Sequence, residues 1–287
     1  MTFSLGDVRA IDAWVVDVDG CLVSTDRAGG SGGEPIAGAV EFLNAVRESG
    51  HPLRVVTNAS QSTPHRYAQH LRDMGFDIRD EEFVTAGSAA AAYLAAHHAG
   101  QRVLAIAEDG IVEPLRALGV KTTVDDPRGV GAVVVGAVSH LPMERLDAAC
   151  HAVADNGAPL YVTVDTPWFH GGRGRSVCTS AAVAHAIAWV TGVEPVVLGK
   201  PSDALAATLR GDLGGADARI AVVGDAPAEI ALARAMDARA IAVLTGALDR
   251  ARVDAAMARG DGPDLAVESV ADLTELVSET HPRSARV

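Results

Sequence analysis

WVVDVDGCL, residues 14–22, is an apolar run that ends in two aspartates and a glycine. The apolar run predicts a buried strand, and Asp17 and Asp19 then follow its carboxyl end with i, i+2 spacing. Two like charges at this separation repel each other unless a cation compensates them. The pair therefore indicates either a solvated turn or a site at which a cation and other segments of the chain converge.

Strand-like and helix-like segments alternate on both sides of this run. A helix is expected over 37–50, where the spacing is helical and Gly50 provides a stop, and a strand follows over 52–58. The same alternation recurs over 219–246 and, in the middle of the chain, over 102–164. This pattern predicts a parallel, doubly wound α/β sheet, in which ligands bind at the carboxyl ends of the strands.

Length and charge limit the classes of protein that fit. The chain has 287 residues, enough for one large domain or two modest ones, and 48% hydrophobic residues, enough for a sizeable core. Its net charge of −13 argues against a nucleic-acid backbone or an anionic membrane surface as a partner. A small anionic ligand remains compatible with this charge if the chain supplies a local positive site.

Cysteine usage and the N-terminal sequence favour a cytoplasmic protein. The three cysteines, Cys21, Cys150 and Cys178, are an odd number and show no metal-type spacing, so reduced thiols are expected. The first residues lack a basic segment followed by an apolar one, and no stretch of about 18 uninterrupted apolar residues occurs. We therefore expect neither a signal peptide nor a membrane span.

Polar residues follow other predicted strands as they follow the first. If the sheet is parallel, all of them meet at one edge, where a lysine and a divalent metal would neutralise the two aspartates and a phosphoryl group would complete the charge balance. The residues are Asp17 and Asp19, Thr57 and Asn58, Lys200, and Asp225 with Glu229 four residues later.

The order of these segments resembles the haloacid dehalogenase-like phosphatase superfamily. DVDG, VVTN, GKP and VVGD occur in that order along nearly the whole chain. TNASQS after the second strand, the spacing of 142 residues from Asn58 to Lys200 and VLTG near the end are similar to the branch with p-nitrophenylphosphatase, phosphoglycolate phosphatase and glycerol-phosphate phosphatase. The resemblance implies a Rossmann-like core over 1–85 and 183–287 and an inserted α/β cap over 86–182.

The resemblance also implies roles for the acid pair and the lysine. Asp17 would be the nucleophile that forms an aspartyl-phosphate, and Asp19 would protonate the leaving oxygen and later activate water. Lys200 would bridge Asp17 and the phosphoryl group and so reduce the repulsion between two anions.

Phosphate and metal ligands follow from the same resemblance. The Thr57 hydroxyl and the Asn58 backbone would bind phosphoryl oxygens. Mg²⁺ would be held by the carboxylates of Asp17 and Asp225 and by the carbonyl oxygen of Asp19, an all-oxygen ligand set that suits this ion.

Three segments depart from the family pattern. GDAPAEI is one residue shorter than usual, so that Glu229 stands near the position of the second acid, from which its longer side chain could reach the metal shell through water. The cap segment VTVDTPWFHGGRGRS keeps Asp165 but lacks the usual asparagine and proline beside it. The loop at 25–35, TDRAGGSGGEP, is longer than usual, and its glycine content predicts a mobile surface loop rather than a lid. These departures leave the substrate open.

The cap segment 165–176 supplies further candidates for substrate recognition. Trp168 and His170 are candidates for specificity, and Arg173 and Arg175 either contact an anionic substrate or are solvated loop charges.

We therefore expect a Mg²⁺-dependent phosphatase that acts on a small phosphorylated metabolite of the sugar phosphate, glycerol phosphate or phosphoglycolate type. A non-catalytic pseudo-phosphatase that binds a phosphate ligand and a phosphomutase are the alternatives. Pairing of two chains through the cap into a homodimer is a further expectation from the resemblance. No G-x-G-x-x-G follows the first strand, so a nicotinamide-binding fold is disfavoured.

Overall fold

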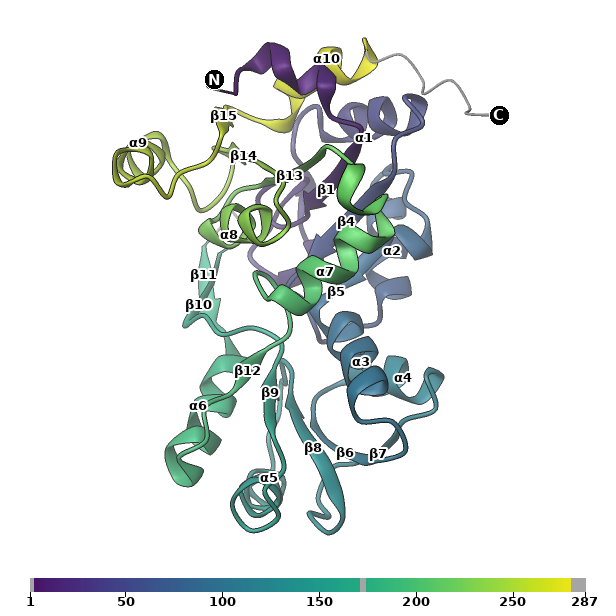
Figure 1. Ribbon diagram of the computed structural model, residues 1–287, viewed down its shortest axis with the longest axis vertical. Coiled ribbons are helices and arrows are strands. Elements are labelled where there is room, and N and C mark those ends of the chain that lie inside the picture. The colour runs from purple at the N-terminus through teal and green to yellow at the C-terminus, as the bar shows by residue number, and fades with distance from the viewer. Residues whose placement is uncertain (1–2, 171–173, 280–287) are drawn as a thin grey trace.

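The structure is a computed structural model that describes residues 3–170 and 174–279, except for the side chain of His170. Within these residues it contains two large parallel β-sheets, one above the other in Figure 1. The upper sheet has the strand order β15-β14-β13-β1-β4-β5. Its strands are β1 (Ala13–Asp17), β4 (Leu53–Thr57), β5 (Phe83–Thr85), β13 (Ile220–Gly224), β14 (Arg239–Val243) and β15 (Leu265–Val267).

The alternation of side chains along β1 explains why both faces of the upper sheet are covered. Trp14 and Val16 pack on one face, where the Trp14 ring meets Phe42 edge-on at 5.6 Å between ring centres, and Ala13 and Val15 pack on the other. The first face is covered by α1 (Ala39–Glu48), α2 (Pro64–Asp73) and α10 (Thr274–Ser278), and the second by α7 (Asp203–Asp212), α8 (Pro227–Ala235) and α9 (Arg250–Arg259).

The lower sheet is built in the same way from the middle of the chain. Its strand order is β12-β9-β8-β6-β7, and all its neighbouring pairs are parallel. The strands are β6 (Arg102–Ile106), β7 (Lys121–Thr123), β8 (Val130–Val135), β9 (Leu160–Val162) and β12 (Val196–Val197). One face packs against α3 (Ala86–His97) and α4 (Asp109–Ala117), and the other against α5 (Met143–Ala154) and α6 (Thr179–Thr191).

Two short antiparallel hairpins complete the strands of the described residues. In one, β2 (Val23–Ser24) pairs with β3 (Glu34–Pro35), and in the other, β10 (Trp168–His170) pairs with β11 (Arg175–Val177). The remaining elements are 3₁₀ turns: η1 (Leu5–Ala10), η2 (Ala28–Gly30), η3 (Asp80–Glu82), η4 (Gly215–Asp217) and η5 (Val270–Leu273).

These sheets confirm the predicted fold class, a doubly wound parallel α/β core with a separate inserted α/β unit. The division at 182 stays a prediction, and the pairing of the strands favours a later one. β12 pairs with β9, and Ala184, Ile187 and Ala188 of α6 pack into the core of the lower sheet. We therefore propose that the cap comprises residues 86–198.

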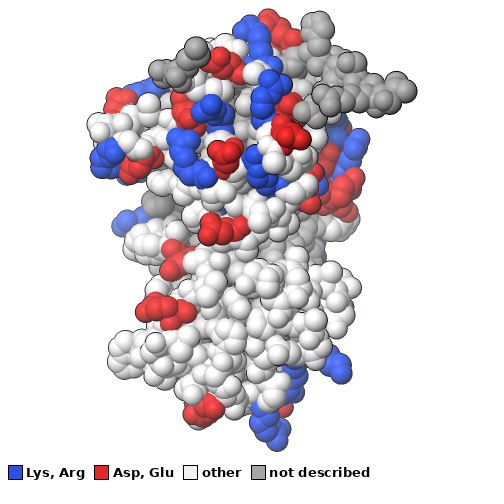
Figure 2. Space-filling model, viewed as in Figure 1, with Lys and Arg blue, Asp and Glu red and all other residues white. Residues whose placement is uncertain are grey.

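The visible face carries no broad patch of one sign. In Figure 2, lysines and arginines are interspersed with acids over the core, and charged side chains are sparse over the cap. A polyanion would need a continuous basic surface, which this face lacks. In the described residues, no helix is long and apolar enough to cross a membrane.

A close-packed joint connects the cap to the loop that follows β4. The Ser60 hydroxyl accepts a hydrogen bond from the Ala137 amide at 2.9 Å, and the Gly110 amide donates to the Gln61 carbonyl at 3.1 Å. A methyl group on Gly110 would overlap the carbonyl oxygens of Ser60 and Ser62. The orientation of the cap therefore depends on glycine at position 110.

Gly110→Ala is expected to lower the free energy of unfolding by about 1–3 kcal/mol, because an extra methyl group in a packed joint forces the backbone apart. Gly211 is the matched control, since it also lies in a helix and a methyl group there would meet nothing within 4 Å. Gly211→Ala should stabilise the protein by about 0.5–1 kcal/mol through helix propensity. Denaturant unfolding measures both free energies. Equal effects of the two substitutions would contradict the close packing of Gly110 against the loop after β4.

Candidate active site

Residues from four distant segments meet at the carboxyl edge of the core sheet. Asp17 is the last residue of β1, Thr57 is the last residue of β4, Asp225 follows β13 directly, and Lys200 lies in the turn that precedes α7. Asp17, Asp19 and Lys200 are each no more than 6% exposed. The predicted convergence is therefore present in the structure, and it is buried.

Lys200 lies among carboxylates. Its Nζ forms ion pairs with Asp17 Oδ1 and with Glu229 Oε1, the latter at 2.8 Å, and donates a hydrogen bond to the Val56 carbonyl at 3.2 Å. Burial alone would lower the pKa of Lys200, but the carboxylates of Asp17 and Glu229 outweigh it and raise the pKa. The lysine therefore stays protonated and fixes the nucleophile candidate.

The side chain of Asn58 holds the backbone of Lys200. The Lys200 amide donates to Asn58 Oδ1 at 2.9 Å, and Asn58 Nδ2 donates to the Lys200 carbonyl at 3.2 Å. Sequence reasoning assigned Asn58 to the phosphate through its backbone and did not anticipate this pairing. The motif after β4 therefore sets the position of the lysine across 142 residues of sequence.

Asp19 is held by three donors. Its Oδ2 accepts from the Gly29 amide at 2.9 Å and from the Thr57 hydroxyl at 3.0 Å, and its Oδ1 accepts from the Gly30 amide at 2.6 Å. Burial raises the pKa of Asp19, although these hydrogen bonds favour the ionised form and oppose the rise. Thr57, which was expected to bind phosphate, donates to Asp19 in this structure.

The contacts of Gly29 and Gly30 add to the expectation of a surface loop over 25–35. Most of the loop is exposed or half-buried, but both of these glycines are buried and reach into the site. The composition of the loop shows only that its backbone is permissive. It does not show that positive φ angles at two adjacent residues would point both amides at one carboxylate.

Asp225 lies against the turn that follows β14. Its Oδ2 accepts from the Ala247 amide at 2.6 Å. Burial, followed by repulsion from Glu229, raises the pKa of Asp225 to about 7. Gly20 is needed at this point, because its φ is +84° and a side chain there would meet the Asp225 carboxyl group.

The site has an excess of buried negative charge. Four carboxylates surround the single Lys200 ammonium, and burial, together with repulsion from the other acids, raises the pKa of Asp17 well above its usual value even though Lys200 opposes the shift. A divalent cation would relieve this repulsion. The acids are Asp17, Asp19, Asp225 and Glu229.

The donors at the site fit Mg²⁺. They are all oxygens. Among the described residues, no group of three His, Cys, Asp or Glu side chains forms a complete set of metal ligands. Mg²⁺ is commonly held by one or two carboxylates and keeps several waters. Carboxylates from Asp17 and Asp225 with the Asp19 carbonyl match that requirement. Glu229, a candidate for the metal shell, instead pairs with Lys200 and accepts from the Ala226 amide at 3.0 Å.

The remaining candidates lie in the cap. Asp165 pairs with His185 of α6 at 2.6 Å, and the Arg175 guanidinium stacks over the Trp168 ring at 4.3 Å from its centre. The charge of Arg175 is therefore engaged with an aromatic ring. Arg173 and the side chain of His170 lie outside the described residues.

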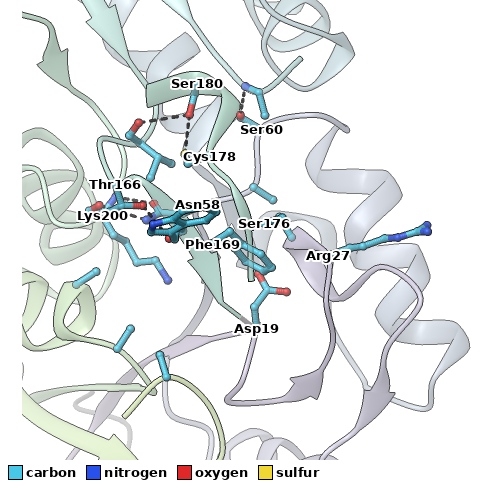
Figure 3. Close-up of a pocket in the computed structure, with 18 of the residues that line it drawn as sticks. Asp19, Arg27, Asn58, Ser60, Thr166, Phe169, Ser176, Cys178, Ser180 and Lys200 are labelled. Atoms are coloured by element: carbon cyan, nitrogen blue, oxygen red, sulfur yellow. Dashed lines mark hydrogen bonds between the residues drawn. The ribbon is translucent and has the colours of Figure 1, made fainter. Parts of the chain in front are cut away.

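A cavity of about 1070 Å³ lies between the core and the cap and contains the acids and Lys200. Phe169 and Ser176 of the β10–β11 hairpin line this cavity together with Asp19 and Asn58, as do Ser60 and Ser180 (Figure 3). Phe169 directly follows the predicted candidate Trp168, but nothing in the sequence pattern indicates that it lines the site.

Comparisons with known proteins agree with this geometry. The family profile described as haloacid dehalogenase-like hydrolase matches residues 14–121, and a related HAD-hydrolase-like profile matches 197–273. An acid sugar phosphatase from Staphylococcus epidermidis is 29% identical over 218 residues, which is 76% of this chain and 80% of that protein.

Solved structures give the same result. A p-nitrophenyl phosphatase from Archaeoglobus fulgidus superimposes with a TM-score of 0.81 at 27% identity over 92% of this chain and 98% of that one. A glycerol phosphate phosphatase from Mycobacterium tuberculosis in complex with magnesium gives 0.79 at 27% identity, over 96% and 80%. The chain therefore belongs to the haloacid dehalogenase-like hydrolases, in the branch of capped phosphatases that includes p-nitrophenyl and glycerol phosphate phosphatases.

Proposed function

We propose that this phosphatase hydrolyses a small phosphate monoester with an uncharged leaving alcohol, in a Mg²⁺-dependent reaction through an aspartyl-phosphate on Asp17. The observation that carries the proposal is the buried ion pair of Lys200 with Asp17 at the base of the cavity. A protonated lysine favours the ionised form of this carboxylate and is placed to neutralise an incoming phosphoryl group.

In the first step an Asp17 oxygen attacks phosphorus. The bond between phosphorus and the ester oxygen breaks, its electron pair goes to that oxygen, and the oxygen takes a proton from the Asp19 carboxyl group. The products are the alcohol, an acyl phosphate on Asp17 and the Asp19 carboxylate. Lys200 faces the charge that builds up on the phosphoryl oxygens.

In the second step water attacks the acyl phosphate and gives a proton to Asp19, which returns the Asp17 carboxylate and releases inorganic phosphate. Mg²⁺, when bound by Asp17, Asp225 and the Asp19 carbonyl, would offset the negative charge of the phosphoryl group. Asn58 holds the Lys200 backbone throughout.

The cap side of the cavity supports an uncharged leaving group. Among the described residues, no cap side chain that lines the cavity is charged. The wall consists of hydroxyl-bearing, small and apolar side chains, the last including Val138, Val164, Trp168, Phe169 and Val177. A carboxylate on the leaving group would be desolvated against this wall with no cap cation beside it, which is costly. The described arginines that line the cavity, Arg27 and Arg252, belong to the core.

This wall favours sugar, glycerol or aryl phosphates over phosphoglycolate. The leaving groups named in the relatives, sugars, glycerol and p-nitrophenol, are uncharged as alcohols.

The pairing of two chains through the cap into a homodimer stays a prediction.

Asp17→Asn should lower the rate of phosphate release by at least about 10³-fold, because an amide cannot act as the nucleophile. The measurement is release of inorganic phosphate from a panel of esters with saturating Mg²⁺. Equal release by wild type and variant would contradict the nucleophile assignment. Binding of phosphate esters without turnover by the wild type would indicate a pseudo-phosphatase, and an isomerised sugar phosphate would indicate a mutase.

Asp225→Asn should change the response to metal and pH. In metal-free wild type the pKa of Asp225 is raised from 3.8 to about 7, so the folded protein binds more protons than the unfolded chain between these values. Stability therefore falls as pH rises through this window, by up to about 1.4 kcal/mol per pH unit, and the variant should lack this contribution.

Saturating Mg²⁺ should raise the wild-type Tm, with about 2.7 kcal/mol of stabilisation at 100 times its Kd, and should raise the Tm of Asp225→Asn far less. Asp26→Asn, which removes an exposed carboxylate at the cavity rim, should respond like wild type. An equal rise in Tm for all three proteins would contradict the metal assignment. Thermal melts in chelator and in Mg²⁺ give the comparison.

Trp168→Ala should raise KM for phenyl phosphate about 5–10-fold, because the cavity loses an aromatic wall worth about 1–1.4 kcal/mol to a ring. Trp189→Ala is the matched control, since Trp189 is 88% exposed and does not line the cavity.

Wild type should also prefer glycerol phosphate to phosphoglycolate, as measured by kcat/KM. A preference for phosphoglycolate would contradict the uncharged wall.

A further inference from the structure

The 25–35 loop is a folded element that lies on α2. It follows β2 and ends in β3, which pair with each other. The hydroxyl of Thr25, which is fully buried, accepts from the Arg27 amide at 3.0 Å, and its one proton is shared between the carbonyls of Ser31 at 2.9 Å and Arg27 at 3.1 Å. Gly29 lies against the Tyr67 ring, where a methyl group would overlap the ring atoms. The loop therefore has a defined conformation, fixed by its own hydrogen bonds and by α2.

Two consecutive amides of this loop bind the two oxygens of one carboxylate. Gly29 and Gly30 have φ angles of +73° and +75°, so their N–H groups point in the same direction, toward Asp19. L-residues with side chains rarely adopt these angles. Arg27 of the same loop extends away from Asp19 in Figure 3, so the contact is made by the main chain.

We propose that the main chain of Gly29 and Gly30 is the positioning element for Asp19 in proton transfer to the leaving alcohol. The inference rests on the proposed function and deepens it. The two amides fix the plane of the carboxyl group, and the Thr57 hydroxyl supports it from the core side. Gly29 and Gly30 are positioning residues, since they act through Asp19.

The chemistry of the first step provides a specific readout. When the bond between phosphorus and the ester oxygen breaks, a poor leaving group needs the Asp19 proton on that oxygen, whereas p-nitrophenolate leaves without it. A displaced Asp19 therefore slows esters of weakly acidic alcohols selectively. A general loss of folding or of phosphate binding would slow all esters alike. kcat/KM isolates this step, because it covers events up to loss of the alcohol.

The test compares p-nitrophenyl, phenyl and benzyl phosphates, which share a ring but differ in the acidity of the leaving alcohol. Gly30→Ala adds a methyl group whose nearest neighbour is a Leu71 methyl at 3.2 Å, so the main effect is on the backbone angle. It should lower kcat/KM about 10–100-fold for benzyl phosphate and less than about 3-fold for p-nitrophenyl phosphate.

Gly32→Ala is the matched control. Gly32 lies in the same loop at φ +68°, with open space around a side chain, and does not contact Asp19. It carries the same backbone penalty and should leave the ratio of benzyl to p-nitrophenyl turnover at the wild-type value. An equal loss for all three esters in Gly30→Ala, or the same selective loss in Gly32→Ala, would overturn the inference.

Thr25 supplies a second pair of variants if Gly30→Ala does not fold. Thr25→Val keeps the buried shape but removes the hydroxyl that holds the loop, and Thr25→Ser keeps the hydroxyl. The valine variant should show the selective loss and the serine variant should restore the wild-type ratio. Unchanged ratios in both would overturn the inference. Wild type that releases phosphate neither from the three esters nor from sugar and glycerol phosphates would overturn the proposed function and this inference together.

Discussion

The ion pair between Lys200 and Asp17 is the interaction on which the rest of the site depends. Removing an ionised carboxylate from water costs several kcal/mol, and four acids are buried within this one cluster. One lysine cannot balance the charge of four acids, so a further cation would stabilise the folded protein. The excess negative charge makes the site complementary to a metal ion and a phosphoryl group bound together. A chemistry that develops negative charge on phosphoryl oxygens suits a pocket with this composition.

The residues of this cluster are held in place by short segments at the ends of strands. The segment 57–60, which ends β4 and begins the following loop, makes three different contacts within four residues. Thr57 donates to Asp19, Asn58 holds the Lys200 backbone and Ser60 binds the cap at Ala137. A change in the orientation of the cap therefore reaches the loop that holds both the acid and the lysine. Close packing at Gly110 restricts such a change, because no space remains for a side chain at the joint.

Sequence reasoning reached the fold class because apolar runs and helical stretches alternate in a regular way, and it reached the cluster because parallel strands end at one edge. It could not place Gly29 and Gly30, since a glycine-rich segment has no side-chain pattern that reveals where its amides point. The partner of Glu229 was also hidden. Spacing suggested a metal ligand, but the acid turns toward Lys200. β12, with two residues, is too short for a periodicity signal, so the sequence pattern does not reveal its pairing with β9, on which the proposed later end of the cap is based.

The most direct measurement of the central claim is to locate the phosphoryl group during turnover. Acid quench of the wild type with a phosphate monoester and Mg²⁺, followed by peptide mass analysis, should find one phosphoryl group on Asp17. Lys200→Ala should show little or none, because the nucleophile then lacks the cation that opposes its protonation and compensates the incoming anion. A phosphoryl group on another residue, or full labelling of Asp17 in Lys200→Ala, would contradict the account.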